Sequence, residues 1–210
     1  MTLPAYHQST GFLDAADHRR MLDWTLANRA RFKAASLVGD LVDPTQRVSE
    51  TLRDLGPMQA ILERRFTEML LVLLKDTGTK PFEVEKIELE LAAHGEGAHF
   101  VAHSDTVTGE SRRVAREAGR AQQDRIVSAV YYFYREPKGF SGGELRIHPL
   151  GSKGKGGGHV DIQPLQNSVV AFPSWAYHEV RPVRCESNAF EDHRFAVNCW
   201  LCRDVERGAH

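Results

Sequence analysis

The chain has 210 residues, of which 41% are hydrophobic and 26% are charged, and its formal net charge is −1 with the histidines neutral. This length allows one sizeable domain with its own core, and the composition is ordinary for a globular protein in water. The near-zero net charge gives no general attraction to nucleic acid or to an anionic membrane, and no apolar run approaches the roughly 20 residues that span a bilayer.

The start of the chain and the cysteines indicate the compartment. Residues 1–11 lack a basic region followed by an apolar one, so we expect no signal peptide. Cys185, Cys199 and Cys202 are the cysteines, and the last two form a C-x-x-C that suits a redox pair or half of a zinc site. No second pair accompanies it and the flanking residues are typical of a strand. We therefore expect strand cysteines without a redox role, in a reducing cytoplasm.

Two amphipathic helices are predicted in the first part of the chain. One covers residues 12–30, with Asp14 as its N-cap. The other begins at Pro57 and ends near Thr77, with large apolar residues at helical spacing between them. Residues 31–55, which separate the helices, show no clear period.

From Pro81 onward, apolar and polar residues alternate as they do in β-strands. A half-buried strand is predicted over residues 87–93 and a second strand over residues 99–105. The second would place His103 and Asp105 on one face, because side chains two residues apart point the same way. Further strands are predicted at residues 125–134, 141–147, 168–172 and 193–201.

Two long segments interrupt these strands. Residues 106–124 are charged and small, and they form either a flap beside the site or a solvated excursion. The flap is favoured because the segment leaves directly from Asp105. Residues 151–159 are rich in glycine and carry two lysines. A solvated loop is favoured there over a lid that receives an acidic substrate.

No internal repeat or linker divides the chain, so we expect a single domain over residues 1–210. It would consist of a helical part, residues 1–80, and a strand core, residues 81–202. The expected fold class is mostly β with flanking helices (α+β), in which two facing sheets carry the helices outside one of them.

The strongest chemical signal is His103 and Asp105 read together with His178. An imidazole and a carboxylate on one face are two metal ligands, and a second imidazole from a distant strand is a third. Two histidines and one carboxylate leave one side of the metal open, which is the arrangement that non-haem Fe(II) oxygenases use. A His-x-Asp pair alone is common by chance, so its context decides.

Such an iron site needs a co-substrate to reduce O2. If that co-substrate is 2-oxoglutarate, its far carboxylate needs a cation, and the planar fork of arginine pairs with a carboxylate bidentately. Arg194 opens the last predicted strand and shares a face with Asn198 and Trp200. The hydroxyl of Tyr132 would add a second hydrogen bond.

Three motifs, in this order and spacing, resemble those of the 2-oxoglutarate/Fe(II) oxygenases, and most of all the prolyl 4-hydroxylase-like branch. They are His103-Ser104-Asp105, the tyrosine-rich strand followed by Ser141-Gly142-Gly143-Glu144-Leu145-Arg146, and Phe172-Pro173-Ser174 leading to His178-Glu179-Val180-Arg181-Pro182-Val183. The match runs from about Ile87 to Leu201. The resemblance implies a double-stranded β-helix, or jelly roll, with an N-terminal helical layer.

The resemblance also implies roles for individual residues. Its implied iron ligands, which are also the catalytic residues, are His103, Asp105 and His178. Its implied 2-oxoglutarate contacts are Arg194 and Tyr132 at the far carboxylate, with Val130 and Leu145 lining the pocket. The segment between His178 and Arg194 is longer than is usual in the family, so Arg181 and Arg184 stay open as alternative carboxylate partners.

The activity implied is a dioxygenase that uses Fe(II), 2-oxoglutarate and O2 to hydroxylate an unactivated C–H bond, with release of succinate and CO2. Ascorbate is a candidate reductant. The substrate class stays open between peptidyl proline, an amino acid and another small molecule, with no nucleic-acid or membrane partner. Two other classes stay open: a cupin-like metal enzyme that needs no buried Arg194, and a non-catalytic β-sandwich binding module that needs neither metal nor arginine.

Histidines outside the ligand set have simpler expectations. His94 and His99 flank the first metal strand, and a packed or solvent-facing position is favoured for both over a role in the pocket. His148, His159 and His193 are expected at the surface.

Overall fold

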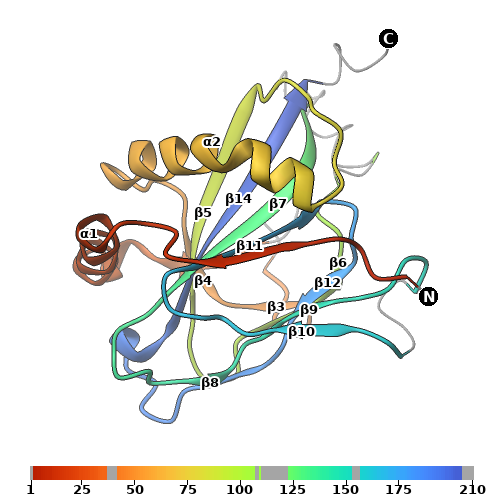
Figure 1. Ribbon diagram of the computed structural model, residues 1–210. Helices are drawn as coiled ribbons and strands as arrows, with labels where there is room; N and C mark the ends of the chain where they lie inside the picture. Colours follow the sequence, from red (N-terminus) through yellow and green to blue (C-terminus); the bar gives the residue numbers. More distant parts are fainter. Residues whose placement is uncertain (1, 37–41, 107–108, 110–122, 153–156, 205–210) are drawn as a thin grey trace.

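The computed structural model describes residues 2–36, 42–106, 109, 123–152 and 157–204. In this part of the chain two antiparallel sheets face each other, and helix α2 lies across the outer face of the larger one (Figure 1). Most of the predicted flap at 106–124 and the centre of the predicted loop at 151–159 lie outside the described residues, while residues 123 and 124 belong to a strand.

The larger sheet contains the long strands of the molecule. In spatial order its strands are β1 (His7–Thr10), β11 (Ser168–Pro173), β7 (Gln123–Phe133), β14 (Arg194–Asp204), β5 (Lys86–His94), β4 (Glu50–Leu52) and β2 (Lys33–Ala34). The smaller sheet runs in the order β10 (Val160–Ile162), β9 (Leu145–Ile147), β12 (His178–Val180), β6 (His99–His103) and β3 (Arg47–Val48). A two-stranded ribbon pairs β13 (Val183–Arg184) with β8 (Ser141–Gly142).

Both predicted helices are confirmed, with ends close to those expected. Helix α1 (Ala15–Ala27) begins after Asp14, whose side chain accepts hydrogen bonds from two backbone N–H groups of the first turn. Helix α2 (Met58–Asp76) ends before Gly78, whose φ of 65° favours glycine. Short 3₁₀ turns, η1 (Arg29–Arg31) and η3 (Phe190–Asp192), complete the helical elements of the described residues.

The core has two layers, one on each face of the larger sheet. The outer layer joins the helices to the sheet, and its aromatic centre is Phe12, whose ring lies 4.7 Å from that of Phe66 and 4.8 Å from that of Tyr131. The inner layer lies between the two sheets and contains Val130, Tyr132, Leu145, Ile147, Ile162, Val170, Phe172, Ala176 and Ala196. The helices therefore cover one face of the sheet and leave the other face to the space between the sheets.

Replacing Phe66 with alanine should lower the free energy of unfolding by about 3–5 kcal/mol, because its ring is fully buried between α2 and the sheet. Leu71→Ala on the same helix is the matched control, since that side chain is 77% exposed and its loss should cost less than about 0.5 kcal/mol. Urea denaturation of the two variants measures the difference. Equal losses would mean that α2 is not seated on the sheet.

Two expectations need correction in the strand part of the fold. Strand β5 alternates as predicted, but its polar side is not solvated: Glu90 is only 4% exposed because it faces the space between the sheets and pairs with Arg47. The first 80 residues are not only helical, because they also supply β1 to β4. These strands are two to four residues long, which is too short for alternation to identify them.

The described residues contain no helix that is both long enough and apolar enough to cross a membrane.

Candidate metal centre

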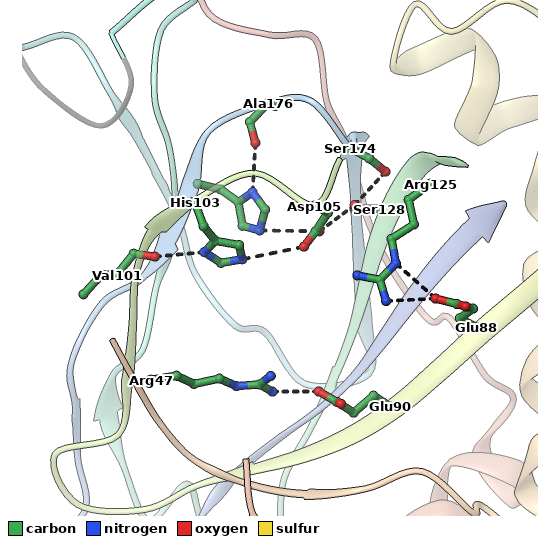
Figure 2. Close-up of polar contacts among 11 residues, drawn as sticks. Arg47, Glu88, Glu90, Val101, His103, Asp105, Arg125, Ser128, Ser174 and Ala176 are labelled. Carbon is green, nitrogen blue, oxygen red and sulfur yellow. Dashed lines mark hydrogen bonds and ion pairs between the residues drawn. The ribbon is translucent and has the colours of Figure 1, made fainter. Parts of the chain in front are cut away.

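His103, Asp105 and His178 meet between the two sheets (Figure 2). One candidate ligand atom from each lies within 4.8 Å of the others, and the described part of the chain holds no second group of three such residues. Nε2 of His103 is 3.6 Å from Oδ1 of Asp105, and Nε2 of His178 is 3.6 Å from Oδ2. The three side chains that the sequence singles out are therefore brought to one point.

The two imidazoles come from neighbouring strands and are oriented in the same way. His178 at the start of β12 is directly paired with His103 at the end of β6. Nδ1 of His103 lies 2.8 Å from the carbonyl oxygen of Val101, and Nδ1 of His178 lies 2.9 Å from that of Ala176. A carbonyl oxygen only accepts, so each Nδ1 carries the proton and each Nε2 lone pair faces Asp105.

Asp105 lies beyond the end of its strand, which corrects the predicted range of 99–105, because β6 ends at His103. The backbone N–H of Asp105 donates to the carbonyl of Ser174 at 2.9 Å. The hydroxyl of Ser128 donates to Oδ2 of Asp105 at 2.6 Å and lies 2.9 Å from the hydroxyl of Ser174. Two serines, rather than strand pairing, therefore position the carboxylate, and the sequence assigned no role to either of them.

The electrostatics of the cluster favour a divalent cation. Burial raises the pKa of Asp105, but the imidazoles of His178 and His103 and the Ser128 hydroxyl outweigh it and hold that pKa well below its usual range. Burial and the neighbouring His103 lower the pKa of His178 to about 4. At neutral pH the site thus offers an ionised carboxylate and a neutral His178, which are the forms that bind metal.

The metal-free protein should lose stability as the pH falls from 6.5 towards 4. An unfolded histidine takes up a proton near pH 6.5, whereas folded His178 stays neutral until about pH 4, so acid favours the unfolded chain. The contribution of His178 to the free energy of unfolding should fall by about 3 kcal/mol over this range. Urea denaturation with a chelator at pH 7, 5.5 and 4.5 measures it. A His178→Gln variant should fall less steeply, and equal slopes would contradict the assignment.

Arg194 and Tyr132 form a second polar group in the same inter-sheet space. Arg194 is 1% exposed, its guanidinium carbon lies 4.7 Å from the centroid of the Tyr132 ring, and its Nη1 lies 3.1 Å from Nδ1 of His94. Nε of Arg194 and the Tyr132 hydroxyl are both buried without a hydrogen-bond partner among the described residues. Unpartnered buried donors of this kind are rare, so a ligand is expected to satisfy them.

Two neighbours of Arg194 fit its charge and its size: His94 stays neutral beside it, and Gly143 leaves room for its side chain. Burial and the charge of Arg194 lower the pKa of His94 well below its usual range, so His94 is a neutral pocket residue rather than a solvent-facing one. A Cβ atom at Gly143 would lie 2.7 Å from Cδ of Arg194, so glycine is needed where the two elements approach.

One pocket connects the metal-binding cluster with Arg194. All seven predicted site residues line it, together with His94, Phe172 and Val180, to which the sequence assigned no place in the pocket. Arg47 and Phe100, which the sequence did not single out, line it as well. The other arginines considered for the carboxylate do not line it: Arg181 lies 3.4 Å from Glu179, and Arg184 is exposed. The structure thus brings Arg194, and neither alternative, into the pocket.

The remaining histidines and cysteines differ in how well their positions match the expectations. His148 and His193 are 4% and 7% exposed, so the expectation of surface positions was wrong for both. Cys199 and Cys202 lie in β14 and are buried, as expected for strand cysteines. Burial raises the pKa of Cys202 to about 12, which leaves no reactive thiolate at neutral pH.

Comparison with known proteins agrees with this geometry. Residues 89–202 match the model of the 2OG-Fe(II) oxygenase superfamily. An uncharacterized PKHD-type hydroxylase of Synechocystis sp. is 37% identical over 148 residues, which cover 69% of this chain and 45% of that protein. The chain therefore spans less than half the length of this curated relative.

Solved structures show the same fold at low identity. A Pseudomonas putida prolyl-4-hydroxylase superposes with a TM-score of 0.67 at 21% identity, covering 96% of this chain and 94% of that one. A Trichoplax adhaerens prolyl hydroxylase, in complex with a hypoxia inducible factor peptide fragment, gives 0.67 at 17% identity and covers 98% and 86%. The expected jelly-roll architecture is thereby confirmed. Because the family match over residues 89–202 covers more than half of the chain, the chain belongs to the 2OG-Fe(II) oxygenase superfamily.

Proposed function

We propose that the protein is an Fe(II)- and 2-oxoglutarate-dependent dioxygenase that hydroxylates an unactivated C–H bond and releases succinate and CO2. The observation that carries this proposal is that one pocket combines a His-Asp-His cluster with two buried donors, Nε of Arg194 and the hydroxyl of Tyr132, that have no hydrogen-bond partner among the described residues. A cupin-like enzyme without 2-oxoglutarate would leave the Arg194 guanidinium buried for no purpose, at a cost in desolvation.

The donor set fits Fe(II). His103 and His178 would bind it through Nε2, and Asp105 through a carboxylate oxygen, because these atoms converge and Nδ1 of each imidazole is already bonded to a backbone carbonyl oxygen. When bound, Fe(II) together with 2-oxoglutarate supplies the activation of O2 that C–H hydroxylation needs. Ser128 and Ser174 keep the carboxylate of Asp105 in place while the backbone carbonyls of Val101 and Ala176 fix the imidazoles.

The opposite end of the pocket fits the far carboxylate of 2-oxoglutarate. Nε of Arg194 and the hydroxyl of Tyr132 would each donate to it, which satisfies both buried donors and offsets the burial of the anion. His94 accepts from Nη1 of Arg194 and so holds the guanidinium in one orientation. Val130 and Leu145 would line the carbon chain between the two ends.

Aromatic rings shield the imidazoles from water. The ring of Phe100 stacks on His103 with centroids 3.7 Å apart, and the ring of Phe172 lies 4.6 Å from His178. A dry pocket strengthens the interactions of charged groups within it and limits side reactions.

Our candidates for the prime substrate are peptidyl proline, an amino acid and another small molecule, and ascorbate is a candidate reductant. We assign the protein to the cytoplasm, because its three cysteines are buried free thiols, which a reducing compartment preserves.

The test is succinate formation by protein purified without oxygen and then given Fe(II), 2-oxoglutarate, ascorbate and O2. We expect slow succinate release that needs all of Fe(II), 2-oxoglutarate and O2 even without a prime substrate. Fe(II) binding without 2-oxoglutarate binding or turnover would favour the cupin-like alternative, and failure to bind either would favour a binding module. Mass spectrometry of cell extract incubated under ¹⁸O₂ would then identify the hydroxylated product.

A further inference from the structure

We propose that the pocket contains a second carboxylate-binding subsite, formed by Arg47 and Asn198, and that the prime substrate is a carboxylic acid. This inference rests on the proposed function, because it names the class of molecule that would be hydroxylated. Figure 2 shows the side chain of Arg47, on strand β3 next to β6, pointing towards Glu90 on strand β5 of the larger sheet.

The guanidinium of Arg47 is held in place by two hydrogen bonds, and its third nitrogen is left without a protein partner among the described residues. Its Nε donates to the hydroxyl of Ser49 at 3.1 Å and its Nη2 to Oε1 of Glu90 at 2.7 Å. The plane is further supported by Phe100, whose ring centroid lies 5.1 Å from the guanidinium carbon. Nη1 makes no hydrogen bond or ion pair with any residue that the structure describes. A rigid, pocket-lining donor of this kind is pre-organised for an anion.

The charge around Arg47 is not balanced by the side chains that the structure describes as its partners. Glu90 is shared, since its other oxygen accepts from Nε of Arg53 at 3.2 Å. Two guanidinium groups therefore meet one carboxylate, and the three side chains together carry a charge of +1. The side chain of Arg53 is 73% exposed and that of Arg47 only 10%, so the charge that water does not screen is the one lining the pocket.

Asn198 supplies a second donor in the same part of the pocket. It lies on β14 directly opposite Glu90 on β5, with its side chain lining the pocket. Its amide makes no hydrogen bond within the described portion of the chain. An arginine N–H and an amide N–H beside the metal cluster match the two oxygens of a carboxylate. Arg194 and Tyr132 remain for 2-oxoglutarate, so the two acids would occupy different donors.

A carboxylate could come from a free small acid, such as an amino acid, or from an acidic side chain of a peptide. The subsite is formed by inward-facing residues between the sheets, and Arg47 is largely buried, which favours a small free acid. An internal residue of a peptide has lost its backbone carboxylate to the amide bond, so only an acidic side chain could bring the charge that Arg47 needs.

The experiment is anaerobic titration calorimetry of the Fe(II)- and 2-oxoglutarate-loaded protein. The probes are a panel of free L-amino acids, the primary amide of each, and a capped peptide with an internal glutamate. We expect at least one free acid to bind at least about tenfold more tightly than its amide and than the peptide. Arg47→Met should remove this preference, and Arg47→Lys should retain part of it because the charge survives.

Arg53→Met is the matched control, since it removes the other guanidinium from Glu90 on the exposed side and should leave the preference for acids unchanged. Equal binding of acid and amide, no binding of any free acid, or tighter binding of the peptide would overturn the proposal. The proposal would also be overturned if Arg47→Met lost 2-oxoglutarate affinity by the same factor as it lost affinity for the free acid, because Arg47 would then bind the co-substrate. Repeating the titration without metal and 2-oxoglutarate separates the proposed subsite from the proposed oxygenase activity. If the protein never binds 2-oxoglutarate but still prefers free acids to their amides, only the oxygenase assignment is overturned.

Discussion

Asp105→Ala should abolish succinate formation and weaken Fe(II) binding by more than about a hundredfold. The side chain is the anionic member of the cluster, and its loss leaves a bound cation with two imidazole ligands and no negative charge beside it. The fold should survive, because Asp105 lies beyond the end of β6. Anaerobic Fe(II) titration, combined with the succinate assay, measures both effects.

Two controls bracket this result. Ser128→Ala keeps the carboxylate but removes the hydroxyl that donates to it, so metal affinity should fall by about tenfold and activity should persist in part. Asp161→Ala removes a carboxylate that pairs with Arg146 outside the metal cluster, and it should change neither quantity. Full activity of Asp105→Ala would exclude this residue from the site, whatever its geometry.

Arg194→Met should weaken 2-oxoglutarate binding by roughly 30-fold to several thousandfold, which corresponds to the ~2–5 kcal/mol typical for truncating one partner of a buried charged pair. Arg194→Lys should retain part of the affinity, because the charge survives while the planar fork does not. Anaerobic titration of the Fe(II) protein, followed by the visible absorption of its 2-oxoglutarate complex, measures the affinity directly. Fe(II) binding itself is expected to stay near that of the unaltered protein.

The two nearby arginines are the natural controls for Arg194. Arg181 lies beside Glu179 outside the pocket and Arg184 is exposed, so Arg181→Met and Arg184→Met should bind 2-oxoglutarate normally. Loss of binding in either of them, together with normal binding in Arg194→Met, would reverse the assignment. If none of the three substitutions weakens 2-oxoglutarate binding, the co-substrate is not 2-oxoglutarate, and a cupin-like metal enzyme becomes the favoured class.

The sequence predicted the parts of this molecule in which one physical signal dominates. Helix α2 has a long apolar stripe, and β7 is a run of β-branched and aromatic residues, so each is recognisable without its partners. The metal cluster could be predicted from the sequence for a related reason. The spacing of His103 and Asp105 and the motif around His178 are local, although pairing of β6 with β12 is needed to bring them together.

What the sequence did not predict depends on contacts between distant residues. Arg47 lies in a segment without periodicity, and its partner Glu90 follows 43 residues later. The alternation of β5 correctly separates two faces, but it cannot tell a face turned to solvent from one turned to a polar pocket. Ser128 and Ser174 are small and common residues, and only the approach of β7 to β11 shows that they hold Asp105.

The short strands from the first 52 residues have a consequence for the behaviour of the protein at high concentration. A sheet edge offers unpaired N–H and C=O groups to other chains, and a long flat edge invites aggregation. Here β1 covers the edge of β11, while the outermost strands β2 and β3 are each two residues long. A chain reduced to the family-matching residues 89–202 would leave β11 unpaired on one side over residues 168–171 and β5 unpaired over residues 91–93. The N-terminal strands therefore guard against intermolecular pairing, in addition to delivering Arg47 to the pocket.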